Sequence, residues 1–372
     1  MSIPPTTPIL QFGTSRFLQA HVDLFLSDAL QRGEAVGPVT VVQSSGDDER
    51  RKRLSALARP GGFPVIIQGL KAGKAVSFET RVTSIVQALG TEMDWTEICR
   101  IVSGEAEIIL SNTGDSGWKR QPDDSELLFR QSMSYPAKLT HLLLARYRAG
   151  GEPIQVMPTE LVSRNGSQLK SRVVELAESL EPEFADWVGT HVRFVNSLVD
   201  RIVSAELEPA GAIAEPYALW AIEDTMGLVV PCVHPCVQVV RSLELIEKLK
   251  LHILNLGHTY LVSRWIEAGG QGSPFVRDLM NDSVSRADLA SVYETEVLPT
   301  FSAWGYQNNA ADYVAVTMER FSNPYLDHRL SDIAQNHDEK IRRRIKAFLD
   351  WSDELDVPHT QRRLRAAAQM LS

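Results

Sequence analysis

The sequence contains few cysteines, no long apolar run and fewer basic than acidic residues, and each shortage excludes a class of protein. Among its 372 residues the only cysteines are Cys99, Cys232 and Cys236, a sparse, odd set that excludes a disulfide-stapled scaffold and is typical of a reducing compartment. No apolar stretch approaches the ~18–20 residues that cross a bilayer, and no secretory signal precedes the first strand-like run. The 38 basic and 47 acidic residues give a formal net charge of −9, which argues against nucleic-acid binding. We therefore expect a cytoplasmic protein without membrane or nucleic-acid partners.

The composition and length predict a globular protein of two or three domains. The hydrophobic fraction of 44% and the charged fraction of 23% are near the averages for such proteins. Strand-like runs at 8–12, Val39–Gln43 and 108–112 alternate with helical patterns such as 17–31, which is typical of a parallel sheet built from βαβ units. From about Ser242 the hydrophobic period is almost entirely helical.

We predict an α/β protein, with a Rossmann-like parallel-sheet N-terminal domain over residues 1–240 and an all-helical C-terminal domain over residues 241–372. The same patterns predict further strands at 65–68, 76–85, 154–157 and 194–202, and further helices at 95–102, 137–147 and 167–180.

The first candidate site is the turn between the first strand and the first helix. Gly13, Thr14, Ser15, Arg16 and Phe17 stand where a dinucleotide pyrophosphate rests on backbone N–H groups. The match to G-x-G-x-x-G is imperfect, because a serine replaces the second glycine and a leucine stands at the third position. A glycine between a strand and a helix is about as often only a tight turn, so both interpretations stay open on these residues.

The end of the second strand does not settle which dinucleotide is used. NAD enzymes of this architecture often carry an acidic residue there, whereas this chain has Gln43, Ser44 and Ser45, followed by Asp47 and a basic run at 50–53. The basic run is most simply the solvated first turn of a helix. NADP therefore stays open beside NAD.

The second candidate site is the stretch 250–258, which places polar residues in an apolar helix. Asn255 and His258 lie within one turn of each other, and Lys250 lies more than one α-helical turn before Asn255. A desolvated lysine can accept an alcohol proton, and an amide can donate to the developing alkoxide. The alternative is a core histidine with a helix-end asparagine and an exposed lysine, and spacing alone slightly favours it.

Two other stretches resemble known binding motifs but do not match them in full, and the motif of another dehydrogenase class is absent. Cys232 and Cys236 cannot supply the four ligands of a structural zinc site, and we expect no metal. The stretch 69–75 is one residue short of a P-loop and is predicted to be a hairpin turn. A Tyr-x-x-x-Lys pair, the mark of a short-chain dehydrogenase, does not occur.

An ordered series of motifs resembles the mannitol dehydrogenase family, the polyol-specific long-chain dehydrogenases. Within the family the chain is most similar to the altronate oxidoreductases, also called tagaturonate reductases. The matching stretches run from residue 9 to about 345 and include 9–13, 111–113, 134–140, 160–161, 165–166, 198–203, Lys250, Asn255, His258, Thr259, and 320–325.

The resemblance implies a role for each matching residue. Lys250 corresponds to the lysine acid/base, Asn255 and Asn165 to asparagines that bind the reacting oxygen, and His258 and Asp200 to residues that position the substrate and support the lysine. Glu160 and Lys340 are candidates for substrate binding. The residues assigned to the cofactor are Gly13, Thr14, Ser15, Arg16, Phe17, Gln43, Ser111, Asn112 and Thr113.

The chain also departs from the family pattern. Ser15 replaces a glycine, Gln19 replaces an arginine, and many altronate-type relatives extend beyond the position of Ser372. If the additional segment shapes the substrate pocket, the substrate could differ from altronate.

The resemblance implies metal-independent hydride transfer between NAD(H) and a secondary alcohol of a linear sugar acid or polyol, in a cleft between the two domains. The alternatives are a hexitol, pentitol or mannonate dehydrogenase of the same family and, more distantly, a non-catalytic dinucleotide-binding sensor. A monomer or a homodimer is expected.

Overall fold

The computed structural model describes residues 6–46, 48–272, 274–357 and 361–369, and the chain forms two compact units. The first unit consists of the chain to Ile67 together with Phe78–Ala214 and Ala218–Leu243. The second consists of Gln68–Ser77, Glu215–Tyr217 and the chain from Glu244 onward. The last of these boundaries is close to the expected change near residue 240, whereas the two short inserted segments were not predicted. In the described ranges, no helix has both the length and the apolar character needed to span a bilayer.

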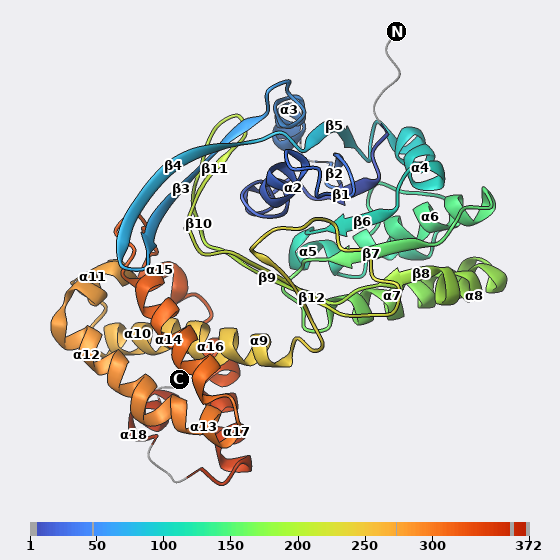
Figure 1. Cartoon of the computed structure of the whole chain (residues 1–372). Coiled ribbons are helices and arrows are strands. Elements are labelled where there is room, and N and C mark those ends of the chain that lie inside the picture. The colour runs from blue at the N-terminus through green and yellow to red at the C-terminus, as the bar shows by residue number, and fades with distance from the viewer. Residues whose placement is uncertain (1–5, 47, 273, 358–360, 370–372) are drawn as a thin grey trace. The chain divides into compact units, whose positions relative to one another are not determined.

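The first unit is built on a six-stranded parallel sheet, which confirms the predicted Rossmann-like α/β fold. Ile9 of the first strand lies opposite Val39 on one side and Ile108 on the other. The order can be followed by colour in Figure 1 and is β5 (Ile85–Gly90), β2 (Val39–Gln43), β1 (Ile9–Phe12), β6 (Ile108–Ser111), β7 (Ile154–Pro158) and β8 (Val192–Phe194).

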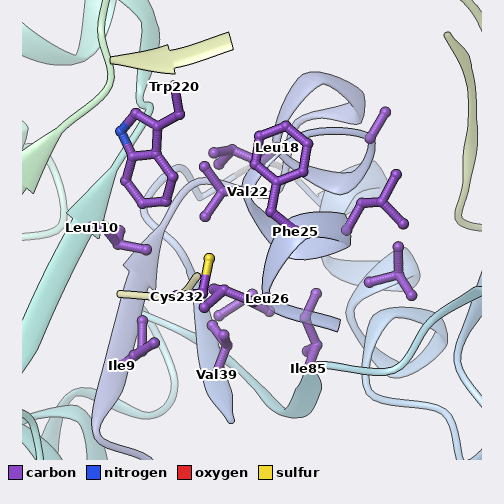
Figure 2. Packing of buried hydrophobic residues seen from close by; sticks show 14 of the residues in the cluster. Ile9, Leu18, Val22, Phe25, Leu26, Val39, Ile85, Leu110, Trp220 and Cys232 are labelled. Carbon is purple, nitrogen blue, oxygen red and sulfur yellow. The ribbon is translucent and has the colours of Figure 1, made fainter. Parts of the chain in front are cut away.

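Helices cover both faces of this sheet, because successive side chains of a strand point to opposite faces. Ile9 packs with the helices α1 (Arg16–Gln19) and α2 (Val22–Leu30), and Figure 2 shows Leu18, Val22 and Phe25 gathered near Trp220. Leu10 packs on the other face. The helices that contribute to this second core are α4 (Trp95–Gly104), α6 (Tyr135–Arg148), α7 (Asn165–Leu180) and α8 (Pro182–His191).

The prediction of a single helix over 17–31 is wrong, because the helical backbone is interrupted at Ala20 and His21. His21 has φ −126° and ψ −98°, outside the helical region, and its Nε2 lies 2.8 Å from the carbonyl oxygen of Leu219. The buried histidine thus bonds to a distant strand at the point where the helix is interrupted. Only the four-residue helix α1 follows the glycine turn directly.

Two predicted strands each divide between different sheets. The run 76–85 divides into β4 (Lys74–Val82) and β5, because the backbone N–H groups of Thr83 and Ser84 both donate to Ser27 Oγ at 2.9 Å and turn the chain. The run 194–202 divides into β8 and β9 (Ser197–Asp200). The strand β9 pairs with β12 (Leu219–Glu223), which in turn pairs with β13 (Val237–Val240).

A further sheet contains the predicted hairpin. Its strand order is β10 (Val203–Glu206), β11 (Ala212–Ala214), β3 (Phe63–Lys71) and β4. The turn between β3 and β4 is Ala72 and Gly73, both with positive φ, as a two-residue type I′ turn requires. The hairpin interpretation of 69–75 is therefore confirmed.

The second unit is helical apart from its two inserted segments, and three of its helical stretches are π turns. The first, η2 (Lys250–Asn255), joins α9 (Glu244–Leu249) to α10 (Leu256–Glu267) without a break in helical backbone. The others are η3 (Tyr293–Val297) and η4 (Ile341–Lys346). The remaining helices are α11 (Val276–Asn281), α12 (Ser283–Val292), α13 (Leu298–Ala303), α14 (Gln307–Phe321), α15 (Leu330–Ile333), α16 (His337–Lys340), α17 (Ala347–Glu354) and α18 (Arg362–Ala368).

A buried ion pair holds the short segment Glu215–Tyr217 to helix α14. Arg320 donates from Nε and Nη2 to the two carboxylate oxygens of Glu215 at 3.0 and 2.7 Å, and both side chains are almost completely buried. The guanidinium of Arg320 also lies 4.3 Å from the centre of the Tyr217 ring. Bidentate pairing of this kind is directional, so the pair fixes the segment in register with the helix.

Removing one partner of this pair is expected to destabilise the protein strongly. Glu215→Gln should lower the free energy of unfolding by about 3 kcal/mol, because a buried arginine loses its carboxylate. The exposed pair between Arg343 and Glu339 provides the control, since Glu339→Gln should cost less than about 1 kcal/mol. Chemical denaturation measures both changes, and equal losses would contradict the assigned importance of the buried pair.

Candidate functional site

The first unit contains a cavity of about 640 Å³ beside the carboxyl ends of β1, β2 and β6. This is the edge of an open parallel sheet at which nucleotides bind, and the volume is within the usual range for small-molecule pockets. Seven of the predicted cofactor residues line it, namely Gly13, Thr14, Ser15, Arg16, Gln43, Asn112 and Thr113. The other two lie elsewhere: Phe17 stacks on His21, and Ser111 is completely buried.

Gly13 is required by the close approach of two loops. Its φ of +118° is a conformation that residues with a Cβ rarely adopt, and an added Cβ would lie 2.4 Å from the carbonyl oxygen of Asn112. Its N–H donates to the carbonyl of Val42 at 3.0 Å. The glycine therefore lets the loop after β1 pass directly against the loop after β6, at the mouth of the cavity.

Gln19, one of the two residues near the loop after β1 that depart from the family pattern, supports that loop through side-chain hydrogen bonds. Its Nε2 donates to the carbonyl of Thr14 at 3.0 Å, and its Oε1 accepts from the N–H of Gly211 and from Arg16 Nη1 at 2.7 and 3.2 Å. Ser15, the other departure, caps helix α1 by accepting from the N–H of Leu18 at 3.3 Å. A helix of four residues contributes little dipole, so the shape of the loop depends mainly on these side-chain bonds.

Glu160 holds the second loop in place. One carboxylate oxygen accepts from the backbone N–H and the hydroxyl of Thr113 at 2.9 and 3.2 Å, and the other accepts from Ser111 Oγ at 3.0 Å. Burial raises the pKa of Glu160 above its usual value, and these hydrogen bonds oppose the shift. Its observed contacts are with the predicted cofactor loop, and a direct contact with substrate stays a prediction.

The cavity also contains residues that the sequence analysis did not assign. Lys138, at the start of helix α6, donates from Nζ to the carbonyl of Ser44 at 2.7 Å, and Gln131 Nε2 donates to the same oxygen at 3.1 Å. Burial lowers the pKa of Lys138 to about 8. Lys138 belongs to the stretch 134–140 that carries the family resemblance, which is the signal that could have identified it.

Asn165 forms a cluster of backbone contacts at the end of strand β7. Its Nδ2 lies within hydrogen-bonding distance of the carbonyls of Pro158, Glu160 and Ser197, at 3.0, 3.1 and 2.8 Å. Its Oδ1 accepts from the N–H groups of Gly166 and Ser197 at 2.9 and 3.0 Å. Within the first unit the buried amide thus connects the start of α7 to β9, whose last residue is the buried Asp200.

In the second unit, the π turn η2 changes the geometry expected for the lysine and the asparagine. An α-helix separates residues five apart by about 140° around its axis, whereas a π turn closes its hydrogen bonds between residues five apart and stacks them. Lys250 and Asn255 are the first and last residues of this turn. Two residues at the ends of a π turn are separated by a smaller angle around the helix axis than the same residues in a regular α-helix.

Two side chains bond to the carbonyls of this turn. Tyr293 donates its hydroxyl to the carbonyl of Ile253 at 2.9 Å, and Thr259 donates to the carbonyl of Asn255 at 2.9 Å. A Cβ at position 257 would lie 1.9 Å from the Tyr293 oxygen, so Gly257 is needed for the tyrosine to reach the turn.

His258 is buried beside the π turn among positively charged groups. Its ring lies 4.2 Å from the ring of Phe321 and 4.7 Å from that of His328, between centres. Burial first, and then the charges of His328, Arg344, Arg320 and Lys340, hold the pKa of His258 well below its usual value. Its Nε2 has no hydrogen-bond partner within the described ranges, so a neutral imidazole retains an unused polar atom.

The Cys232–Cys236 stretch shows an ordinary local structure. Cys232 is buried in the core, and both cysteines are free thiols. His234 lies 3.5 Å from the carboxylate of Asp28. No group of three or more potential metal-ligating side chains occurs among the described residues.

The comparisons with known proteins identify the family. The model of the mannitol dehydrogenase Rossmann domain matches residues 7–229, and that of the mannitol dehydrogenase C-terminal domain matches residues 242–370. This chain belongs to the mannitol dehydrogenase family. The expected family and an oxidoreductase acting on a CH–OH group are thereby confirmed, and the cavity lies within the part matched by the Rossmann domain.

The curated relatives of this family member include several altronate oxidoreductases. The protein of that name from Bacillus subtilis (strain 168) is 31% identical over 376 residues, covering 93% of this chain and 76% of the relative. That from Klebsiella pneumoniae is 28% identical, covering 91% and 73%.

Among solved structures, a substrate-free D-sorbitol dehydrogenase aligns with a TM-score of 0.80 at 19% identity, covering 95% of this chain and 78% of that one. Pseudomonas fluorescens mannitol 2-dehydrogenase, in a ternary complex with NAD and D-mannitol, aligns with a TM-score of 0.71 at 18% identity, covering 98% and 84%. These two similarities support the mannitol dehydrogenase fold.

The close approach at Gly13 predicts a specific loss of dinucleotide binding. Gly13→Ala should weaken NADH binding at least about tenfold, because the added methyl group displaces the loop at Asn112. Gly33→Ala is the matched control, since Gly33 also has positive φ but no atom lies within 4 Å of a Cβ added there. Fluorescence titration with NADH measures both, and equal affinities of the two variants would contradict the role of the close approach.

The lowered pKa of Lys138 predicts a pH dependence of dinucleotide affinity. The lysine is a cation below its pKa of about 8 and loses its charge above it, so affinity for an anionic dinucleotide should fall as the pH rises from 7 to 9.5. Lys138→Gln should bind more weakly at pH 7 and show a flatter profile. Lys170→Gln, which changes an exposed lysine of α7, is the control and should keep the wild-type pH profile. If Lys138→Gln also kept that profile, Lys138 would be excluded as the origin of the pH dependence.

Proposed function

We propose that this chain is a NAD-dependent dehydrogenase that transfers a hydride between NAD(H) and a secondary alcohol of a linear sugar acid of the altronate and tagaturonate type. The observation that carries the proposal is the π turn that begins at Lys250 and ends at Asn255, followed in the same helical run by the buried His258, whose pKa is held well below its usual value. These are residue types that can hold an alkoxide and move its proton.

The cavity of the first unit fits a dinucleotide. The loop at Gly13 has no room for a Cβ, and it joins a strand to a helix at the position where backbone N–H groups bind phosphate in this fold. NAD, when bound, supplies the hydride acceptor. Because Ser44 and Ser45 follow β2 without a carboxylate and Lys138 bonds to Ser44, NADP should be measured in parallel.

In the proposed mechanism, Lys250 takes the hydroxyl proton during oxidation and returns it during reduction. The amide of Asn255 donates to the oxygen as negative charge develops on it. His258, kept neutral by burial, can donate or accept one hydrogen bond to a substrate hydroxyl without carrying charge. A direct bond from Asn165 to the reacting oxygen and a supporting role for Asp200 stay predictions.

The names of the relatives support a sugar acid as substrate, since several of them are altronate oxidoreductases. The structural similarity to a mannitol 2-dehydrogenase that binds D-mannitol supports a polyol as the second candidate. A cytoplasmic location and a monomeric or homodimeric state stay predictions.

The test of the catalytic proposal is the removal of the lysine. Lys250→Gln should lower kcat for NADH-dependent reduction of tagaturonate by about 10²–10⁴-fold, the usual contribution of general acid–base catalysis, while NADH still binds. Lys248→Gln is the control: Lys248 lies 4.0 Å from the centre of the Trp351 ring, and its loss should leave kcat within a few-fold.

Full turnover by folded Lys250→Gln, with folding checked by circular dichroism, would remove the lysine from the mechanism. A substrate panel of tagaturonate, fructuronate and fructose, with NADH and NADPH, separates sugar acid from polyol specificity. Nucleotide binding without turnover of any panel member would instead support a non-catalytic sensor.

A further inference from the structure

Two cations beside the candidate catalytic cluster form no ion pair with a carboxylate of the described residues. Lys340 ends helix α16, and Arg344 lies four residues later in the π turn η4, so both are on neighbouring positions of one helical run. Arg344 Nη1 lies 3.4 Å from the carbonyl oxygen of Asn255 and 3.1 Å from Thr259 Oγ1. Lys340 Nζ donates to the carbonyl of Ile333 at 2.7 Å. Every one of these acceptors is neutral.

The absence of an acidic partner distinguishes these two residues from nearby arginines. Arg320 is paired with the buried Glu215, and the exposed Arg343 is paired with Glu339. In the parts of the chain that the structure describes, no carboxylate oxygen lies within 4 Å of the side-chain nitrogens of Lys340 or Arg344. Arg344 therefore disfavours the charge on the half-buried Lys340, and the more distant Glu339 carboxylate opposes this effect without forming an ion pair with Lys340.

The pKa values show the cost of this arrangement. Burial and, to a smaller extent, the charge of Arg343 lower the pKa of Arg344 to about 10. Burial and the charge of Arg344 lower the pKa of Lys340. An anion placed between the two side chains would stabilise the charged form of each.

The cluster lies at the candidate catalytic residues. Arg344 contacts the last residue of the π turn, Asn255, through its carbonyl oxygen, and it contacts Thr259, the neighbour of His258. The charges of Arg344 and Lys340 also act on the His258 ring. An anionic group bound to Arg344 would thus lie next to the helical run that contains Asn255 and His258.

We propose that Arg344, assisted by Lys340, binds the carboxylate of the sugar-acid substrate and selects it over a neutral polyol. The two bonds of Arg344 both use Nη1, so the edge formed by Nη2 and Nε can receive the two oxygens of a carboxylate. A neutral hydroxymethyl group at that position would supply no negative charge to Arg344 and Lys340. This assignment rests on the function proposed above and adds the group that reads the charge of the substrate.

The test compares an acidic and a neutral ketose in variants of one helix. Arg344→Gln should raise KM for tagaturonate about 10- to 100-fold, and it should lower kcat/KM for tagaturonate at least tenfold more than kcat/KM for fructose. Lys340→Gln should cause a smaller loss in the same direction. Arg344→Lys, which keeps the charge without the planar fork, should recover part of the preference. Arg343→Gln, the matched control that removes an exposed arginine one position earlier, should keep the wild-type ratio.

Equal losses for tagaturonate and fructose in Arg344→Gln would show that the arginine only supports the π turn, and would overturn the proposal. The proposal would also be overturned if the wild-type enzyme preferred fructose and Arg344→Gln left the ratio of kcat/KM for tagaturonate to kcat/KM for fructose unchanged. Arg344→Lys keeps the test valid if the glutamine variant does not fold.

A binding measurement separates this proposal from the proposed function. Thermal shift of the wild-type protein with D-altronate or D-altritol, in the presence of NAD, needs no turnover. Stabilisation by altronate alone, lost in Arg344→Gln, partly retained in Arg344→Lys and kept in Arg343→Gln, supports the carboxylate site even in a protein that turns over no substrate. Equal stabilisation by both compounds contradicts it, even if turnover is observed.

Discussion

The arrangement of the second unit depends on one widened helical turn and on the side chains that bond to its carbonyls. The turn Lys250–Asn255 is supported by the Tyr293 hydroxyl at Ile253 and by Thr259 and Arg344 at Asn255. Tyr293 itself begins a second π turn and Arg344 lies within the third, so the three irregular turns are tied together. π turns are frequent at functional sites, and here the candidate acid/base and the candidate oxyanion donor are the first and last residues of one such turn.

The nucleotide half follows a comparable principle, in which two loops are fixed by each other. Gly13 permits backbone contact with Asn112, Glu160 holds the loop that contains Asn112 and Thr113, and Gln19 supports the loop that contains Thr14. These bonds explain how the loop keeps its shape with Ser15 in place of a family glycine and with a helix of only four residues behind it. The first unit thus uses side-chain bonds where the G-x-G-x-x-G pattern uses glycines and a long helix.

Sequence patterns predicted the parallel sheet and the hairpin well, because strand runs with both faces buried and a two-residue glycine turn are local signals. They failed where a distant partner decided the local structure. The break at His21 depends on the carbonyl of Leu219, and the corner at Ser84 depends on the hydroxyl of Ser27. The π turn at Lys250 is likewise decided outside its own sequence, by Tyr293 and Arg344. The motif match identified the candidate lysine and asparagine, and it contained Lys138 without distinguishing it, because the burial of Lys138 and its bond to Ser44 are set by the fold. The contacts of Arg344 with Asn255 and Thr259 are likewise set by the fold.

The way the chain alternates between its units limits how it can be divided. Two segments that come before the boundary at Glu244 belong to the same unit as the helices after it. They are the hairpin tip Gln68–Ser77 and the segment Glu215–Tyr217. A fragment beginning at Glu244 would lack Glu215, and Arg320 would be left in an apolar interior without its carboxylate. Synthesis of the helical portion alone would therefore be expected to give a poorly folded, aggregation-prone product. Recombination that exchanges the second unit between relatives would have to carry all three segments together.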